Sequence, residues 1–97
     1  MADKLYGGLD ETKFRSLVKK SVVDYWNATA SLVKKFGKIS SNKVYIVWQV
    51  KAIQNSKALA GVKFDGDGYY FEFTWNGDQQ EGYLDVYKKQ KHVVVVK

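Results

Sequence analysis

The spacing of the hydrophobic residues changes once along this chain, and that change restricts the fold more than any other feature. Between residues 10 and 36, apolar residues recur at helical spacing. After Ser40-Ser41-Asn42 the period becomes two, as in strands that bury one face. The apolar helical positions are Phe14, Leu17, Val18, Val22, Tyr25 and Leu32. The sequence therefore predicts an N-terminal helix followed by a sheet.

The predicted helix has a signal at each end. Asp10 is the expected N-cap, and Gly37 is the expected C-terminal stop. A helix over residues 10–36 is longer than most helices of globular proteins. It is therefore either continuous or interrupted near Asn27-Ala28-Thr29.

Three strands alternate clearly, and a fourth follows them. Their predicted inward residues are Val44, Ile46, Trp48 and Val50, then Ala58, Ala60, Val62 and Phe64, then Tyr69, Phe71 and Phe73. Residues 53–57, 65–68 and 76–79 are the predicted connections. Matching apolar cross-strand pairs places Trp48 and Phe71 opposite Val62, and Phe71 opposite Leu84. The alanines of the second strand leave room for the helix to cross it.

These elements predict an α+β fold in one domain, residues 1–97. Residues 1–9 form a flexible arm, residues 10–36 the helix, and residues 43–97 an antiparallel meander of four strands. Residues 92–96, HVVVV, do not alternate. They are read as a fifth strand buried on both faces, or as an edge strand that pairs with another molecule, including a second copy of this chain.

The charge of the chain is uneven. The net charge is +6, with +5 in residues 1–43, −3 in residues 44–87 and +4 in residues 88–97. Basic ends suggest an anionic partner such as nucleic acid, although lysines are also common on solvated surfaces. The candidate anion-contacting residues are Lys34, Lys35, Lys38, Lys88, Lys89 and Lys91. The chain has no cysteine, no long apolar run and no signal-peptide pattern, so we expect a cytoplasmic protein without a membrane segment.

No residue pattern points to catalysis. The single histidine, His92, has no cysteine or nearby acid as a partner. Asp65 and Asp67 resemble a fragment of a calcium loop, but the remaining ligands are missing. Glu72 and Asp85 share a sheet face that looks open, whereas acid–base work needs a pocket. We predict no enzyme, no catalytic residue, no metal and no cofactor.

Two surfaces are candidates for binding a partner. The first is the outer face of the sheet, with Tyr45, Tyr70, Tyr83 and Tyr87. These rings either form a contact surface or are covered, for example by the C-terminal strand. The second is the back of the helix, with Arg15, Lys19, Val23 and Trp26, where a Trp beside an Arg has the composition of an interface hot spot. The alternative for Trp26 is that it packs under one of the chain ends.

The second half of the chain carries a resemblance to known proteins. The segments KVYIVWQVKAIQNSKALAG and YYFEFTWNGDQQEGYLDVYKK, together covering most of residues 43–91, are similar to a family of small proteins of unknown function encoded by phages and prophages of Gram-positive bacteria. The resemblance implies an origin, a small accessory protein in the cytoplasm of a bacterial host. It implies no activity and no site residue. More weakly, the order of elements resembles cystatin-like folds, but the Q-x-V-x-G pattern and the Pro-Trp turn are absent.

Three functions are consistent with these features. The first is a non-enzymatic protein that binds and modulates a host protein, for instance a component of a defence system. The second is a basic accessory protein that binds nucleic acid through the chain ends. The third is a structural component that assembles through residues 92–96.

Overall fold

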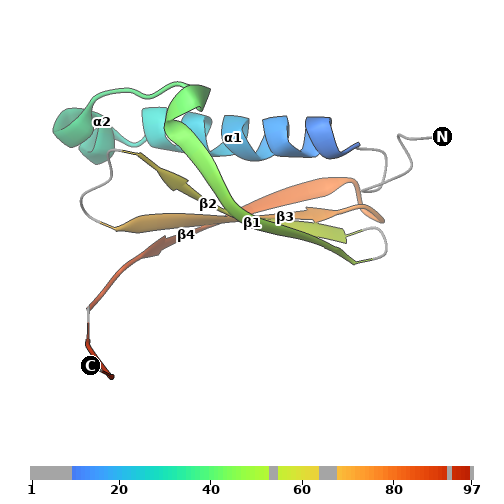
Figure 1. The fold of residues 1–97 in the computed structure, drawn as a ribbon. Helices are drawn as coiled ribbons and strands as arrows, with labels where there is room; N and C mark the ends of the chain where they lie inside the picture. The colour runs from blue at the N-terminus through green and yellow to red at the C-terminus, as the bar shows by residue number, and fades with distance from the viewer. Residues whose placement is uncertain (1–9, 53–54, 64–67, 92, 97) are drawn as a thin grey trace.

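The structure, a computed structural model, describes residues 10–52, 55–63, 68–91 and 93–96, and these form a helical layer over one face of an antiparallel sheet (Figure 1). The elements are α1 (Glu11–Ala28), α2 (Ala30–Phe36), the 3-10 helix η2 (Ser41–Lys43), β1 (Val44–Ala52), β2 (Asn55–Val62), β3 (Tyr69–Asn76) and β4 (Glu81–Lys88). The strands lie in the order β1-β2-β3-β4 and are antiparallel. The predicted α+β meander is confirmed. The predicted N-terminal arm, most of the turn at 65–68 and His92 lie outside the described residues.

Helix α1 begins at its predicted cap and packs on the sheet through one row of side chains. The Asp10 carboxylate accepts a hydrogen bond from the Lys13 amide at 2.7 Å, which satisfies one of the free N–H groups of the first turn. The buried residues of α1 are spaced four apart: Phe14, Val18, Val22 and Trp26. Such a row is inclined to the helix axis. The contact therefore reaches Trp26 and leaves Tyr25, a predicted core residue, 37% exposed.

The predicted long helix is not continuous but is interrupted at Thr29, which was the second of the two predicted alternatives. Thr29 has an extended backbone, its amide donates to the Trp26 carbonyl at 3.0 Å, and its hydroxyl donates to the Tyr25 carbonyl at 2.7 Å. Beyond the break, the side chain of Asn27 holds the returning chain. Its amide nitrogen donates to the Ile39 carbonyl at 2.9 Å, and its oxygen accepts from the Ile39 amide at 2.8 Å. The break thus folds residues 30–40 back against α1.

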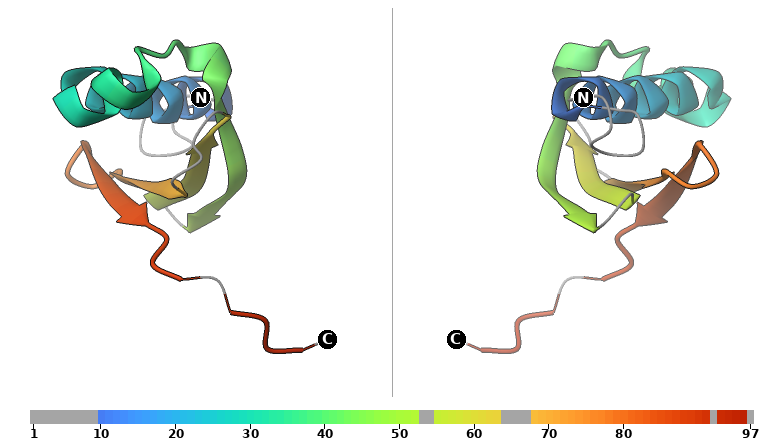
Figure 2. Two further views of the ribbon diagram at one scale, coloured as in Figure 1. Left: turned by 90° about the vertical axis from the view of Figure 1, so that its left-hand side faces the viewer. Right: turned by 90° about the vertical axis from the view of Figure 1, so that its right-hand side faces the viewer.

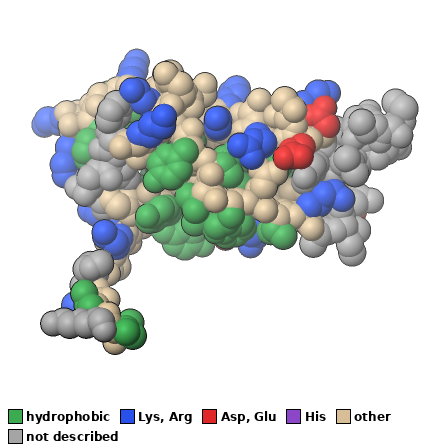
Figure 3. Space-filling model, viewed as in Figure 1, with side chains coloured by type: hydrophobic (Ala, Val, Ile, Leu, Met, Phe, Trp, Pro, Cys, Tyr) green, Lys and Arg blue, Asp and Glu red, His purple; other side chains and the backbone are tan. Residues whose placement is uncertain are grey.

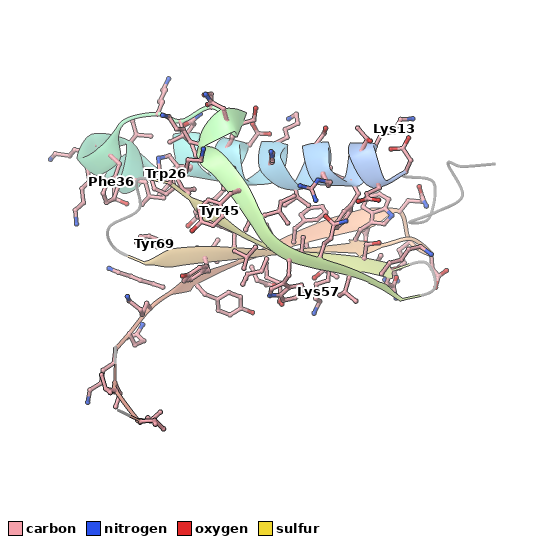
Figure 4. All side chains as sticks on the ribbon, viewed as in Figure 1. Lys13, Trp26, Phe36, Tyr45, Lys57 and Tyr69 are labelled. Atoms are coloured by element: carbon pink, nitrogen blue, oxygen red, sulfur yellow. The ribbon has the colours of Figure 1, made fainter. Side chains whose placement is uncertain are left out.

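The placement of Trp26 on the exposed back of the helix is wrong. Trp26 is 0% exposed, and its indole N–H donates to the Gly37 carbonyl at 3.0 Å. Its ring lies 5.7 Å from the Phe36 ring and 6.5 Å from the Phe71 ring, between the helical layer and the sheet (Figure 4). Phe36 and Gly37 belong to the segment that folds back after the helix break. The spacing of apolar residues along the helix does not predict where that segment lies, so it could not predict the burial of Trp26.

The inner face of the sheet carries the core. Ala58 and Ala60 of β2 are buried, as are Phe71 and Phe73 of β3. Short side chains in the second strand let α1 lie close, and the two aromatic rings fill the space beside it. Phe14 of α1 packs against Phe73 with 6.0 Å between ring centroids. The predicted role of the alanines is confirmed.

The strand register differs from the prediction by two residues at β2–β3 and at β3–β4. Phe71 lies opposite Ala60 and Val86, not opposite Val62 and Leu84. Because side chains alternate with a period of two, a shift of two residues leaves every side chain on its predicted face. The error in register therefore changed which residues pair across the strands but not which side chains face the core.

The turn between β3 and β4 accounts for the shift on that side. Asn76 belongs to the strand, where it pairs with Glu81, and does not open the turn. Its side-chain oxygen accepts hydrogen bonds from the amides of Asp78 at 3.1 Å and Gln79 at 3.2 Å. Asn side chains commonly cap turns in this way. The four-residue turn consequently begins one residue later than predicted and ends one residue later.

A β-bulge in β1 produces a larger correction. Ile46 pairs with Ala60, but Trp48 pairs with Leu59, so the register shifts between them, and Trp48 does not lie opposite Val62. An extra residue in one strand reverses the alternation beyond it. The second half of β1 therefore presents the opposite set of side chains from the predicted set.

The reversal exposes Trp48 and Val50, which were predicted to face the helix. Gln49 faces α1 in their place. Its side-chain oxygen accepts from the Arg15 guanidinium at 2.8 Å, and its nitrogen lies 3.4 Å from a carboxylate oxygen of Glu11. Gln49, Arg15 and Glu11 therefore form a polar cluster at this edge of the helix–sheet interface.

The C-terminal valines do not form a fifth strand. Residues Val93–Val96 have no strand structure and are 59–86% exposed. The chain beyond β4 runs away from the body of the molecule (Figures 1 and 2). Within the described residues the sheet has four strands, and its outer face is not covered by the C-terminal segment.

Candidate functional site

The face of the sheet turned away from α1, here called the open face, is the candidate site. It bears large side chains that are 40–54% exposed, and hydrophobic groups gather along the lower side of the body in Figure 3. Its exposed apolar and aromatic residues are Tyr45, Val47, Trp48, Val50, Tyr70, Tyr83 and Tyr87. A contiguous apolar surface of this kind on a small protein typically marks an interaction site.

Strand pairing divides the open face into two halves. One cross-strand row runs from Trp48 to Leu59, Glu72 and Asp85. A second row includes the Lys57 side chain, which points away from the helices in Figure 4. The half formed by β1 and β2 is mainly apolar, and the half formed by β3 and β4 combines carboxylates with tyrosines.

The paired carboxylates at the centre of the acidic half are poorly compensated. Glu72 and Asp85 are directly opposite one another, an arrangement of like charges that destabilises a sheet. The Lys57 ammonium lies 3.8 Å from a Glu72 oxygen, and no ion pair involving Asp85 is found among the described residues. Folding gains nothing from this arrangement, which is consistent with a role in binding.

Hydrogen bonds to carboxylates hold two of the tyrosines. The Tyr83 hydroxyl donates to Glu81 at 2.6 Å, and this bond, with a smaller effect of partial desolvation, raises the pKa of Tyr83 above its ordinary value of 10.0. The negative charge of Glu72, whose carboxylate lies 3.5 Å from the Tyr87 hydroxyl, is the largest cause that raises the pKa of Tyr87. Both phenols are therefore neutral at physiological pH and act as donors.

The four predicted tyrosines of this face, Tyr45, Tyr70, Tyr83 and Tyr87, are all exposed on it. Tyr70 lies opposite Tyr87 on the neighbouring strand. These rings were predicted either to form a contact surface or to be covered, and the structure shows them exposed. Trp48 joins them through the bulge. The one available signal was a run of five apolar residues at positions 44–48, where strict alternation fails.

The predicted patch on the back of α1 does not assemble. Trp26 is in the core, and Arg15, although exposed, is directed to Gln49 on β1. Lys19 and Val23 are half-buried and line a shallow cavity of about 550 Å³. The other residues lining this cavity are Ser16, Lys20, Ile39, Ser40 and Ser41. Without an exposed aromatic anchor, this surface lacks the feature for which it was predicted.

The predicted anion-contacting lysines come from both chain ends, and the fold brings them toward one end of the molecule. Lys34, Lys35 and Lys38 lie in and after α2, at the left in Figure 1. Lys88 and Lys89 lie where β4 ends on the same side, and Lys91 follows in the tail; all six are exposed. The Lys89 amide donates to the Gly68 carbonyl at 2.9 Å, which fixes the start of the tail.

The described residues contain neither a candidate metal site nor a helix that could span a membrane. No group of three or more His, Cys, Asp or Glu side chains there could hold a metal ion. No described helix is long and apolar enough to cross a membrane. The Glu72 and Asp85 pair lies on the open face.

The fold and this face define a small α+β protein with one helical layer and one uncovered sheet face. Residues 15–97 match the model of a protein family of unknown function, DUF6275, and the chain belongs to this family. No curated protein and no solved structure is significantly similar to it. The family match includes β4 and the C-terminal tail and covers most of the chain.

Proposed function

We propose that this protein is a non-enzymatic binding module that holds a protein partner against its open face. The observation that carries the proposal is the set of aromatic and aliphatic side chains exposed there, with Trp48 and Tyr83 43% and 45% accessible. Trp and Tyr supply much of the binding energy of protein interfaces when a partner excludes water from them. The sheet itself is rigid, so these side chains are positioned before binding and little ordering entropy is lost.

The two halves of the open face define the chemistry of the partner. The apolar half around Trp48 and Leu59 fits a hydrophobic surface. The half with Glu72 and Asp85 fits Lys or Arg side chains, which also interact favourably with tyrosine rings. A partner surface that combines apolar and basic residues satisfies both halves.

The same charges argue against nucleic acid on this face. Exposed rings can stack on bases, but single-stranded nucleic acid also needs positive charge along its backbone. The centre of the open face carries two carboxylates, with Lys57 already beside Glu72. Phosphates would be repelled there, so we assign the face to protein.

The resemblance of residues 43–91 to phage and prophage proteins supports a partner of bacterial host origin. We propose an accessory protein that acts in the host cytoplasm and modulates a host protein, such as a component of a defence system. The acid pair lies on an open sheet face, with Asp85 exposed on the surface, and acid–base catalysis works best in a pocket; this supports a non-enzymatic role.

Site-specific photocrosslinking in the host tests the proposal. A benzophenone amino acid is introduced at position 83 on the open face and, as a matched control, at position 20 on the exposed side of α1. We expect a discrete adduct from position 83 that Trp48→Ala abolishes while the fold is retained. Adducts that form equally from both positions, or that survive Trp48→Ala, would refute the assignment.

The gathered lysines favour a second function, the binding of an anionic polymer at the α2 end of the molecule. Lysines from two distant segments at one end increase the local positive potential. Fluorescence anisotropy with a labelled single-stranded oligonucleotide tests this function. Binding through phosphates weakens steeply with salt, whereas an interface on the open face does not. Charge reversal at Lys34 and Lys88 should abolish oligonucleotide binding and leave crosslinking from position 83 intact.

A further inference from the structure

The C-terminal tail is the segment after β4, residues 89–96; its described residues, 89–91 and 93–96, combine strand-forming side chains with high exposure. Four consecutive valines, Val93–Val96, are 59–86% exposed. β-Branched residues favour strands, and a run without alternation is apolar on both faces. The family match continues through residue 97, so the tail lies within the matched domain. Such a segment is stabilised when it is added to a sheet.

Strand β4 offers the edge that such a segment needs. It is the last strand of the described sheet, and its pairing is with β3 alone. Helix α1 packs on β1, β2 and β3, so the inner side chains of β4 are less well covered, and Leu84 and Val86 are only half-buried. An unpaired edge with partly exposed apolar residues is a template for another strand.

The charges of the tail and the β4 edge are complementary. Glu81 and Asp85 are exposed along β4, and the chain beyond it carries Lys88, Lys89 and Lys91. Because β4 and the tail are contiguous, the complementary groups belong to one continuous segment. Two copies of that segment in antiparallel orientation match each acidic half with a basic half.

The direction of the tail favours a second copy over its own sheet. The Lys89 amide donates to the Gly68 carbonyl at 2.9 Å, which extends the β3–β4 ladder past its last pair, Tyr69 and Lys88. The tail therefore leaves as a continuation of β4 and runs away from the body (Figures 1 and 2). It cannot pair with the β4 of its own chain without reversing direction. Another copy presents an antiparallel edge without such a reversal.

We propose that two copies of this protein associate by antiparallel pairing of the segment formed by β4 and the tail, so that the valines of each copy lie along the β4 edge of the other. The contact is isologous and joins the two sheets around a two-fold axis. The valines that point to the helix side extend the apolar surface beside Leu84. Those that point to the other side extend the tyrosine half of the open face. The absence of alternation in the tail is thereby explained.

A specific register follows from the charges. Placing Lys91 opposite Asp85 also places Val93 opposite Tyr83 and Val94 opposite Gly82, because paired positions in an antiparallel ladder move in opposite directions along the two strands. The Lys88 side chains of the two copies meet at the axis in this register, a repulsion that the two Lys91 and Asp85 pairs offset. Hydrogen bonds of the joined ladder supply affinity, and the valines supply apolar burial.

Light scattering of the full chain over a range of concentrations tests the association. We expect a reversible rise from monomer to dimer mass. Val94→Thr with Val95→Thr, which keeps shape and strand propensity but removes apolar surface, should weaken dimerisation at least tenfold. Val47→Thr on the open face should leave it unchanged. A chain that remains monomeric at every concentration, or a dimer that survives removal of residues 93–97, would overturn the proposal.

Disulfide trapping tests the register, since the chain contains no cysteine of its own. Asp85→Cys combined with Lys91→Cys should give a covalent dimer under oxidising conditions, whereas Asp85→Cys with Lys89→Cys should give far less. Equal trapping from both pairs, or none from either in a protein that dimerises, would contradict strand pairing. The outcome can be separated from the proposed function, because Trp48→Ala, on β1 at the other edge of the sheet, should abolish partner capture without changing dimerisation through β4 and the tail.

Discussion

The two faces of the sheet are built from the same strands but are used differently. On the inner face Phe71 is 0% exposed and packs under α1, while its neighbour Tyr70 on the open face is 40% exposed. The inner face contains small and large apolar residues that interlock with a helix. The open face contains aromatic, aliphatic and charged groups with nothing over them in the described chain. One face accounts for folding, and the other is available for recognition.

The largest expected difference in stability between the two faces is between substitutions of two tryptophans. Trp26→Ala removes a buried ring and its hydrogen bond to Gly37, and we expect a loss of about 3–5 kcal/mol in the free energy of unfolding. Trp48→Ala removes a ring that is already 43% exposed, and we expect a loss of less than about 1 kcal/mol. Urea denaturation followed by circular dichroism measures both.

The Trp26→Ala protein can be too unstable to measure, because small domains have only about 5–15 kcal/mol of stability in total. Trp26→Phe is then the better probe, since it retains most of the apolar volume and loses the donor to Gly37. Equal losses from the two positions would show that the inner and open faces are not distinct. For affinity toward the proposed partner we expect the opposite order, with Trp48→Ala weakening binding more than the substitution at Trp26.

Those two tryptophans also show where sequence reasoning succeeds and where it fails. Trp48 was predicted buried and is exposed, whereas for Trp26 both exposure on the back of the helix and packing under a chain end were left open, and it is buried. The periods of 3.6 and two correctly identified the helix, the strands and the meander, because they reflect local geometry. The placement of Trp26 depends on α2, which folds back at Thr29, and the placement of Trp48 depends on a bulge. The helical period does not show the first feature, and the second interrupts the alternation from which Trp48 was placed.

The candidate site, like the fold, was predictable only in part. Tyr70, Tyr83 and Tyr87 were assigned correctly to the outer face because β3 and β4 alternate regularly, and a register error of two residues leaves faces unchanged. Tyr45 was assigned correctly because it precedes the bulge of β1. The exposure of these rings was left open because it depended on the tail. Composition alone does not determine whether a valine run is covered, pairs within the chain or extends into solvent.

A second test uses the same substitution on both faces. Gly82 lies beneath the Phe73 ring and Gly61 beneath the Tyr45 ring, and an added Cβ would come within 2.6 Å of a ring atom at either position. Phe73 is held in the core, so we expect Gly82→Ala to cost about 1–3 kcal/mol through overpacking. Tyr45 is exposed and can swing aside, so Gly61→Ala should cost less than about 1 kcal/mol.

Thermal or urea unfolding of the two glycine variants measures the difference. Neither glycine has a positive φ, so backbone strain does not complicate the comparison. If Gly61→Ala were as destabilising as Gly82→Ala, the Tyr45 ring would be fixed as rigidly as a core ring. In that case Tyr45 would have to be counted as a structural residue and not as part of the binding face.

A smaller and opposite effect is expected from the acid pair. Asp85→Asn removes the repulsion with Glu72 across β3 and β4, and we expect a gain in stability of about 0.2–1 kcal/mol. The gain should shrink at high salt, which screens exposed charges. Asp78→Asn, at an exposed turn position, is the matched control for the loss of one negative charge. A stability that falls on Asp85→Asn would show that this carboxylate supports folding.

The smallest effect concerns the tyrosine hydroxyls of the open face. Glu81→Gln removes the charged acceptor of the Tyr83 hydroxyl, so the raised pKa of Tyr83 should fall toward 10.0, while the pKa of Tyr87, which Glu72 raises, should stay high. A raised pKa means that the folded state holds the phenolic proton more tightly. The stabilisation is therefore complete below the unfolded-state pKa and is lost as the pH rises through the folded-state pKa. NMR titration of the tyrosine ring carbons measures each pKa. If that of Tyr83 does not change in Glu81→Gln, the hydrogen bond does not hold the ring in solution, and Tyr83 is a mobile contact and not a preorganised one.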